Sequence, residues 1–334
     1  MSPLELLGEP FMQRALLAAL LTGIAAPTVG TFLVQRRLSL MGDGIGHIAV
    51  TGVALGLLTG ASPTWTAVVV AVLGAVLIEV IRERGHANGD VALALLFYGG
   101  LAGGILISGL GGQSTSTLGR YLFGSITSIS EQDVVVTLVL SAIVILICVG
   151  LSPQLFAVAQ DPEFARVAGL RVRGYNLMIA VLAAVSVTVA MRTVGLLLVS
   201  ALMIVPVATA QLVTRSFRAT ITAAMALGGL ASLLGLVLTT FAPAETTVAP
   251  GATIVLVALA GFVIAWPVGI WTRHRARLRE PFPAGEPADH ELAGEHPHAH
   301  GPGCGHLAVP HDDHMDYVHD GHRHAPHGEH YDEH

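Results

Sequence analysis

Two residues of the segment SLMGDGIGHIAVTG, at positions 39–52, carry side chains that bind metal ions. Asp43 and His47 are four residues apart, so in a helix they share one face and one cation can touch both. A carboxylate with an imidazole suits Zn²⁺ and Mn²⁺ better than Mg²⁺ or Ca²⁺. Ionised side chains are costly inside a bilayer and usually face a pathway. We therefore predict that Asp43 and His47 contact a metal ion in a transmembrane pathway.

The same pair also has a purely structural explanation. Asp43 and His47 would then be hydrogen-bonded to each other and tie two helices together, with the neighbouring glycines serving only helix packing. If the helix begins near Leu38, a rise of 1.5 Å per residue places His47 roughly 13 Å from its start, near the middle of a bilayer. Two side chains do not complete a coordination shell, so water or a symmetric partner has to supply the rest.

The C-terminal segment from residue 290 onward holds thirteen of the sixteen histidines. They alternate with Asp, Glu, Gly and Pro, a composition that cannot bury a core, so we expect residues 290–334 to be disordered. Histidines at H-x-H and H-x-x-H spacings chelate Zn²⁺, Ni²⁺ or Cu²⁺. We predict that the tail buffers metal through His296, His298, His300, His319, His322, His324, His327 and His330. The alternative is a solvated tail that responds only to pH.

The segments that must position Asp43 and His47 are strongly apolar. Hydrophobic residues make up 53% of the 334-residue chain and charged residues 12%, against about 25% charged in soluble domains. Apolar blocks of about twenty residues are long enough to cross a bilayer. We predict an all-α polytopic membrane protein with spans near 11–34, 39–60, 64–81, 91–109, 133–151, 175–191, 194–213, 219–240 and 251–271. The domains would be a transmembrane permease domain (1–272), a basic, Pro-rich linker (273–289) and the tail (290–334).

The arginines orient these nine spans. With the N-terminus outside, only Arg14, Arg120 and Arg192 fall on the outer side. The cytoplasmic side then holds Arg36, Arg37, Arg82, Arg84, Arg166, Arg171, Arg173, Arg215, Arg218, Arg273, Arg275, Arg277 and Arg279. Basic short loops stay in the cytoplasm, so the C-terminal tail is predicted to be cytoplasmic.

One predicted cytoplasmic loop, residues 152–174, contains the helix signals DPEFARVAG. Asp161 is suited to be the N-cap, Pro162 occupies the first helical position, and Gly169 is placed to end the helix. The short helix either lies in the lipid headgroups or docks a cytoplasmic partner. No GxxxxGK[ST] loop occurs in the sequence, so the chain has no nucleotide site of that kind.

Four segments together resemble a known family. FLVQRRLSLMGDGIGHIAVTGVALG, DPEFARVAGL, MRTVGLLLVSALMIVPVATAQLV and APGATIVLVALAGF are similar, in this order, to the membrane permease of bacterial ABC importers for zinc and manganese. The resemblance covers residues 11–271 and leaves out the histidine-rich tail.

The resemblance implies a multi-pass subunit in the bacterial cytoplasmic membrane that imports a divalent transition metal ion. The histidine-rich tail favours Zn²⁺ as that ion, with Mn²⁺ as the second choice and Fe²⁺ as the third. The resemblance also implies a dimer with a second copy or a close homologue, two cytoplasmic ABC ATPase subunits, and an extracytoplasmic metal-binding protein, without nucleic acid. ATP would be hydrolysed on the partners, so this chain would not be an enzyme and would hold no permanent cofactor. Asp43 and His47 would contact the ion in transit. The ATPases would dock on a segment that includes Asp161, Glu163, Phe164, Ala165, Arg166, Ala168 and Gly169.

Two other functions compete with this prediction. Proton-coupled zinc carriers also have histidine-rich loops, but they repeat HxxxD or HN/HE pairs on two helices, whereas the predicted spans contain one DxxxH, in the reverse order and unrepeated. A membrane metal sensor would use the tail as its working part. Deletion of residues 290–334 separates these functions, because a sensor loses its activity and an importer keeps uptake.

Overall fold

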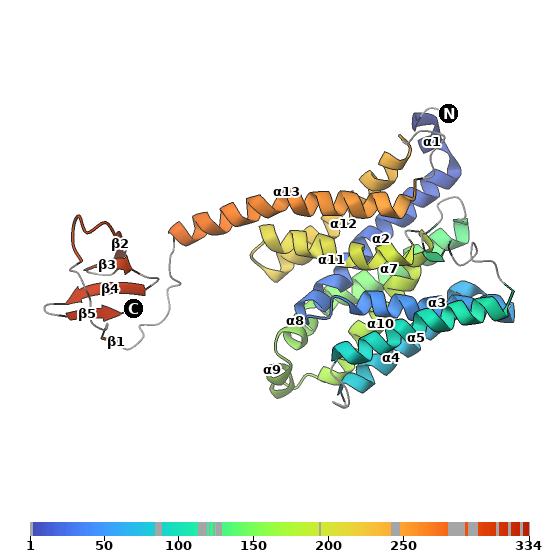
Figure 1. Ribbon diagram of the computed structural model, residues 1–334, viewed down its shortest axis with the longest axis horizontal. Coiled ribbons are helices and arrows are strands. Elements are labelled where there is room, and N and C mark those ends of the chain that lie inside the picture. Colours follow the sequence, from blue (N-terminus) through green and yellow to red (C-terminus); the bar gives the residue numbers. More distant parts are fainter. Residues whose placement is uncertain are drawn as a thin grey trace. The chain divides into compact units, whose positions relative to one another are not determined.

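The computed structural model describes residues 3–83, 89–112, 119, 121–122, 124, 129–193, 195–241, 248–279, 291–292, 300–311, 314–319, 322–327 and 330–333. The chain divides into two compact units, Met1–Thr272 and Arg273–His334. The first unit is a bundle of helices and the second contains a β-sheet (Figure 1).

Long apolar helices build the first unit, as the hydropathy predicts. They are α2 (Pro10–Gln35), α3 (Met41–Thr59), α4 (Pro63–Glu83), α5 (Gly89–Leu110), α7 (Glu131–Gly150), α10 (Val172–Thr193), α11 (Leu196–Val213), α12 (Phe217–Thr239) and α13 (Pro250–Arg279), with the short α1 (Pro3–Gly8), α8 (Ser152–Gln160) and α9 (Pro162–Val167) beside them. Within the described residues, eight helices are long and apolar enough to cross a membrane, and Val199–Val213 of α11 is a shorter apolar helix. These nine helices coincide with the nine predicted spans. The all-α polytopic fold is therefore confirmed.

Small residues let the helices of the bundle approach closely. Helix α2 packs against α7, α10, α11 and α12, and α3 packs against α4 and α5. A Cβ added to Gly228 of α12 would lie 2.2 Å from the carbonyl oxygen of Gly23 in α2. Between membrane helices, such close approach replaces the hydrophobic drive that packs soluble cores.

The buried acid Glu79 lies near the end of α4 and is 2% exposed. Its Oε1 accepts a hydrogen bond from Arg82 Nη2 at 2.7 Å and lies 3.6 Å from Arg36 Nη2. The sequence predicts that Glu79 reaches toward the membrane surface or pairs with Arg82 in preference to binding substrate, and the structure shows the pair. A buried carboxylate is stabilised only when a cation compensates it, so these contacts give Glu79 a structural role.

The loop at 152–174 folds as the cap signals predict. Asp161 Oδ1 accepts hydrogen bonds from the backbone N–H groups of Glu163 and Phe164 at 3.0 and 2.9 Å, and Pro162 opens α9. Gly169 follows the helix with φ +83°, a left-handed conformation that costs glycine little. Helices α8 and α9 therefore form a compact helix–turn–helix between α7 and α10 (Figure 1).

The second unit corrects the prediction of a disordered tail. Five antiparallel strands, β1 (Glu291–Leu292), β2 (Leu307–His311), β3 (His314–His319), β4 (His322–His327) and β5 (His330–Glu333), form one sheet in the order β1-β5-β4-β3-β2. The register pairs His311 with His314, His319 with His322 and His327 with His330, so two residues connect each pair of successive strands from β2 to β5. Antiparallel strands separated by two residues are typical of β-hairpins.

The prediction of disorder was wrong because it weighed only apolar residues. In the tail, ring stacking takes the place of an aliphatic core. His300 stacks on Tyr317 and on His324 with ring centroids 5.5 Å apart in both pairs, and Ala325 is fully buried. The predicted linker also differs from the structure at its start, because α13 continues to Arg279.

Candidate functional site

Asp43 and His47 lie in the first two turns of α3, on one face, as their spacing predicts. Nε2 of His47 is 3.8 Å from Oδ1 of Asp43. The helix begins at Met41 and not near Leu38, because residues 36–40 form a turn closed by the hydrogen bond from Met41 N–H to the carbonyl of Leu38. His47 therefore lies about 9 Å from the N-terminal end of the helix, closer to that end than the roughly 13 Å that the sequence predicts.

Helix α5 encloses His47. The imidazole is 4% exposed and meets the ring of Phe97 edge-on, with centroids 4.1 Å apart and an interplanar angle of 62°. Gly100 of α5 faces the backbone of His47. Within the described residues, Nδ1 of His47 is buried without a hydrogen-bond partner. A buried polar nitrogen without a partner is costly, so Nδ1 has hydrogen-bonding or coordination capacity that no described residue uses.

Helix α11 contributes a hydroxyl to the carboxylate side of the site. Ser200 Oγ donates a hydrogen bond of 3.3 Å to Asp43 Oδ1, and the Asp43 side chain is 30% exposed. The site therefore combines α3, α5 and α11, with the imidazole buried and the carboxylate reachable from outside the bundle. Sequence reasoning missed both Phe97 and Ser200. A lone hydroxyl in the apolar run LLLVSALM was a signal for Ser200, whereas nothing in the sequence singles out Phe97.

The geometry favours a binding pair over a structural tie. A separation of 3.8 Å between Nε2 and Oδ1 exceeds the range of a hydrogen bond. Asp43 and His47 also belong to the same helix, so their interaction does not join two helices. One imidazole nitrogen and one carboxylate oxygen face each other across a gap, an arrangement that a divalent transition metal can bridge.

The tail histidines named above have different placements. His300 and His324 are buried in the second unit. His319, His322, His327 and His330 lie on strands β3, β4 and β5, whereas His296 and His298 fall outside the described residues. The structure instead gathers two mixed groups, His300 with Cys304 and His306, and His311 with His314 and Asp316.

Sequence reasoning missed Cys304, His306, His311, His314 and Asp316 because it considered only spacings between histidines. The stretch HGPGCGH contained the signal for the first group, a cysteine between two histidines. Backbone hydrogen bonds from Gly301 and His306 lower the pKa of the Cys304 thiol, and a thiolate is the form that binds metal.

The residues predicted to couple to an ATPase lie on and around α9. Ala165 is buried against Val158 and Val172. Phe164 and Val167 are 64% and 88% exposed, and Arg166 pairs with Glu163 on the surface at 2.8 Å. Helix α9 thus buries Ala165 against its neighbours and exposes the apolar side chains of Phe164 and Val167.

Comparison with known proteins gives a consistent assignment. The sequence model of the ABC 3 transport family matches residues 9–269. The manganese import system permease protein ScaB of Streptococcus parasanguinis is 35% identical over 256 residues, covering 77% of this chain and 90% of ScaB. The manganese transport system membrane protein MntC of Halalkalibacterium halodurans is 33% identical over 275 residues, covering 81% of this chain and 92% of MntC.

A solved structure agrees with these relatives. PsaBC from Streptococcus pneumoniae in complex with Fab contains a chain with a TM-score of 0.71 and 33% identity, and the match covers 79% of this chain and 94% of that one. The chain therefore belongs to the ABC 3 transport family and is a multi-pass permease subunit of a metal importer in the cytoplasmic membrane.

Proposed function

We propose that this permease conducts a divalent transition metal ion along the face of α3 that carries Asp43 and His47. The observation that carries the proposal is the His47 imidazole, which is 4% exposed and 3.8 Å from a carboxylate, with an Nδ1 that finds no partner within the described residues. Residues of this kind in a membrane span are costly and usually serve transport.

For the transported ion we place Mn²⁺ first and Zn²⁺ second, with Fe²⁺ behind them. The sequence alone put zinc first because of the histidine-rich tail. Two relatives at 33–35% identity are named a manganese import system permease protein and a manganese transport system membrane protein, and a carboxylate donor suits Mn²⁺. Zn²⁺ accepts the same carboxylate and imidazole ligands, which keeps it as the second candidate.

The ion can be identified from metal-dependent ATP hydrolysis. The permease is reconstituted in nanodiscs with its cognate ATPase subunits and binding protein, and hydrolysis is measured with Mn²⁺, Zn²⁺ and Fe²⁺ in turn. We expect the largest stimulation with Mn²⁺. Stimulation by Zn²⁺ alone would reverse the order of metals, and no stimulation by any of the three would contradict an importer of transition metals.

The proposed assembly contains two permeases, either identical or closely related, with two ABC ATPases on the cytoplasmic side and a metal-binding protein outside. Asp43 and His47 supply only two ligands, and the exposed side of Asp43 leaves room for water or a second subunit. ATP is hydrolysed on the ATPases, which dock on α9. The exposed Phe164 and Val167 support this docking surface, since aromatic anchors dominate the binding energy of interfaces.

Truncation of Phe164 tests the docking surface. Replacing Phe164 by alanine is expected to weaken co-purification of the ATPase about tenfold or more, because an interface anchor is worth at least about 1.4 kcal/mol. The matched control is Val213→Ala at the end of α11, also an exposed apolar side chain on the predicted cytoplasmic side. If α9 only lies in the headgroups, both variants keep full ATPase binding, measured as the dissociation constant of the purified subunits.

A further inference from the structure

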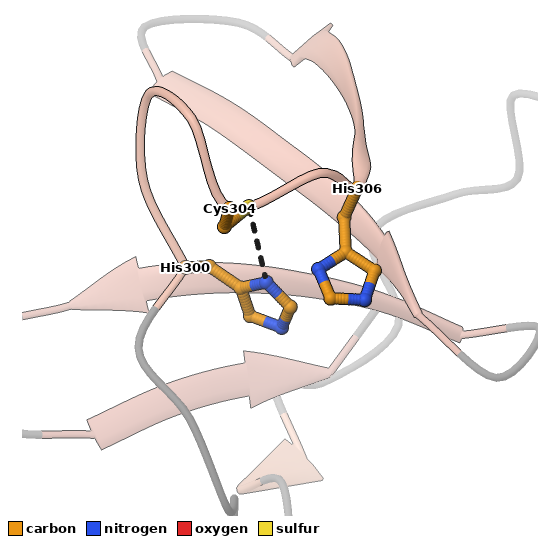
Figure 2. A group of neighbouring side chains, drawn as sticks. All are labelled: His300, Cys304 and His306. Carbon is orange, nitrogen blue, oxygen red and sulfur yellow. Dashed lines mark hydrogen bonds between the residues drawn. The ribbon is translucent and has the colours of Figure 1, made fainter.

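A short glycine-rich loop in the second unit holds a cysteine between two histidines. The loop runs His300-Gly-Pro-Gly-Cys304-Gly-His306 and leads into β2. Gly303 and Gly305, on either side of Cys304, have φ of +99° and +81°. Glycine adopts these left-handed conformations at little cost, so the loop can turn back on itself. Figure 2 shows Cys304 above the His300 ring, with the His306 ring beside them.

The donor atoms of these three residues are gathered, and one pair of them lies at nearly a metal-binding distance. Cys304 Sγ is 3.9 Å from His300 Nδ1, and one donor atom from each residue lies within 4.8 Å of the others. A tetrahedral zinc ion with a thiolate and an imidazole ligand separates sulfur from nitrogen by about 3.6 Å. Binding therefore requires the sulfur and the His300 nitrogen to approach by only a few tenths of an ångström.

The sheet fixes one of the ligands before any ion arrives. His300 is 8% exposed, and its ring is stacked nearly parallel on Tyr317 of β3, at an interplanar angle of 6°. The His306 ring stands almost perpendicular to the His300 ring, at 79° with centroids 4.9 Å apart. Such support lowers the entropy lost on binding, which for a disordered histidine-rich chain would be large.

The second group of donors is less suited to a cation. Asp316 is fully buried and has Oδ2 3.2 Å from His311 Nδ1 and Oδ1 3.2 Å from His314 Nε2. Arg323 Nη1 is also 3.6 Å from Oδ2 of the same carboxylate. A guanidinium is always charged and repels a metal ion at that distance, so the carboxylate is already compensated within the sheet.

We propose that His300, Cys304 and His306 bind one Zn²⁺ ion, with a water molecule in the fourth position. The Cys304 thiol loses its proton to solvent as the S–Zn bond forms, so binding releases one proton from that thiol. A thiolate selects Zn²⁺ over Mn²⁺ because it is a soft ligand. This site is separate from the transport pair proposed on α3, because it lies in the second unit and binds Zn²⁺ in preference to Mn²⁺.

Cobalt spectroscopy on the full-length protein tests the thiolate ligand. The purified permease in detergent is titrated with Co²⁺, and we expect an intense sulfur-to-cobalt charge-transfer band in the near ultraviolet. The chain contains only two cysteines. Cys304→Ser is expected to abolish the band, while Cys148→Ser, the matched control at a thiol buried in α7, keeps it. A band that survives in Cys304→Ser, or none in the unaltered protein, overturns the proposal.

Metal selectivity is measured on the unaltered chain. Alkylation of Cys304 by iodoacetamide, followed by mass spectrometry, should slow at least about tenfold in Zn²⁺ and remain unchanged in the same concentration of Mn²⁺. Equal protection by the two metals overturns the proposal. The Asp43→Ala variant is expected to show the same protection, so failure of the transport pathway and failure of this site give different results.

Discussion

Replacing Asp43 or His47 by alanine is expected to reduce metal uptake more than about 100-fold while the permease still reaches the membrane. Each replacement removes one of the two side-chain donors on α3. Loss of a group that merely supports a metal ligand costs about 10–100-fold, so loss of a ligand itself should cost more. Uptake is measured with radioactive ⁵⁴Mn and ⁶⁵Zn in cells that lack other importers for these metals.

Two conservative variants separate the chemistry from the packing. Asp43→Asn keeps the size of the side chain and an oxygen for Ser200, but removes the charge that attracts a cation, so uptake should still be lost. Ser200→Ala removes a 3.3 Å hydrogen bond that supports the Asp43 carboxylate, so it should lower uptake about 10–100-fold, less than the loss of Asp43 itself. Normal uptake by Asp43→Ala or His47→Ala, at normal membrane levels, would show that the pair is structural.

Gly100→Ala is the second variant with a large expected effect. A Cβ on Gly100 would lie 2.7 Å from the backbone nitrogen of Ile48 and 2.8 Å from the carbonyl carbon of His47. These are backbone atoms and cannot rotate away as a flexible side chain does, so α5 must move off α3. The hydrogen bond from Thr51 Oγ1 to the Gly100 carbonyl, at 2.6 Å, would be strained as well.

Overpacking of this kind costs about 1–3 kcal/mol and displaces Phe97 from the His47 ring. We expect the melting temperature of the detergent-solubilised Gly100→Ala protein to fall by several degrees and its uptake at least about tenfold. Gly99→Ala is the matched control, since nothing lies within 4 Å of a Cβ on Gly99. Alanine there gains about 0.5–1 kcal/mol of helix propensity, so its melting temperature should hold or rise. Equal losses in both variants would contradict close packing at Gly100.

The membrane unit was predictable to a large extent because its signals are local. Each span is an apolar block whose length is set by the bilayer, and the signals Asp161, Pro162 and Gly169 act within one turn of α9. The start of α3 was three residues off, since the turn after α2 depends on Arg37, a non-glycine residue with φ +57°. Its left-handed conformation has no signature in the sequence.

The tail was harder because its stabilising contacts are unusual. Composition argued for disorder, whereas histidine and tyrosine rings stack on the strands of an antiparallel sheet. Whether such rings stack depends on how the loop before β2 lies against the sheet, as the stacking of His300 on Tyr317 of β3 shows. The one local signal, a cysteine between two histidines, was present in HGPGCGH.

The sequence by itself determined that the chain spans a membrane and that Asp43 and His47 share a helix face, because hydropathy and the 3.6-residue period are properties of neighbouring residues. Only the tertiary structure decided what surrounds that face. Phe97 and Gly100 come from α5 and Ser200 from α11, and no periodicity connects them to α3. They meet because small residues allow the helices to cross closely, and that packing leaves the imidazole buried beside a carboxylate that remains accessible.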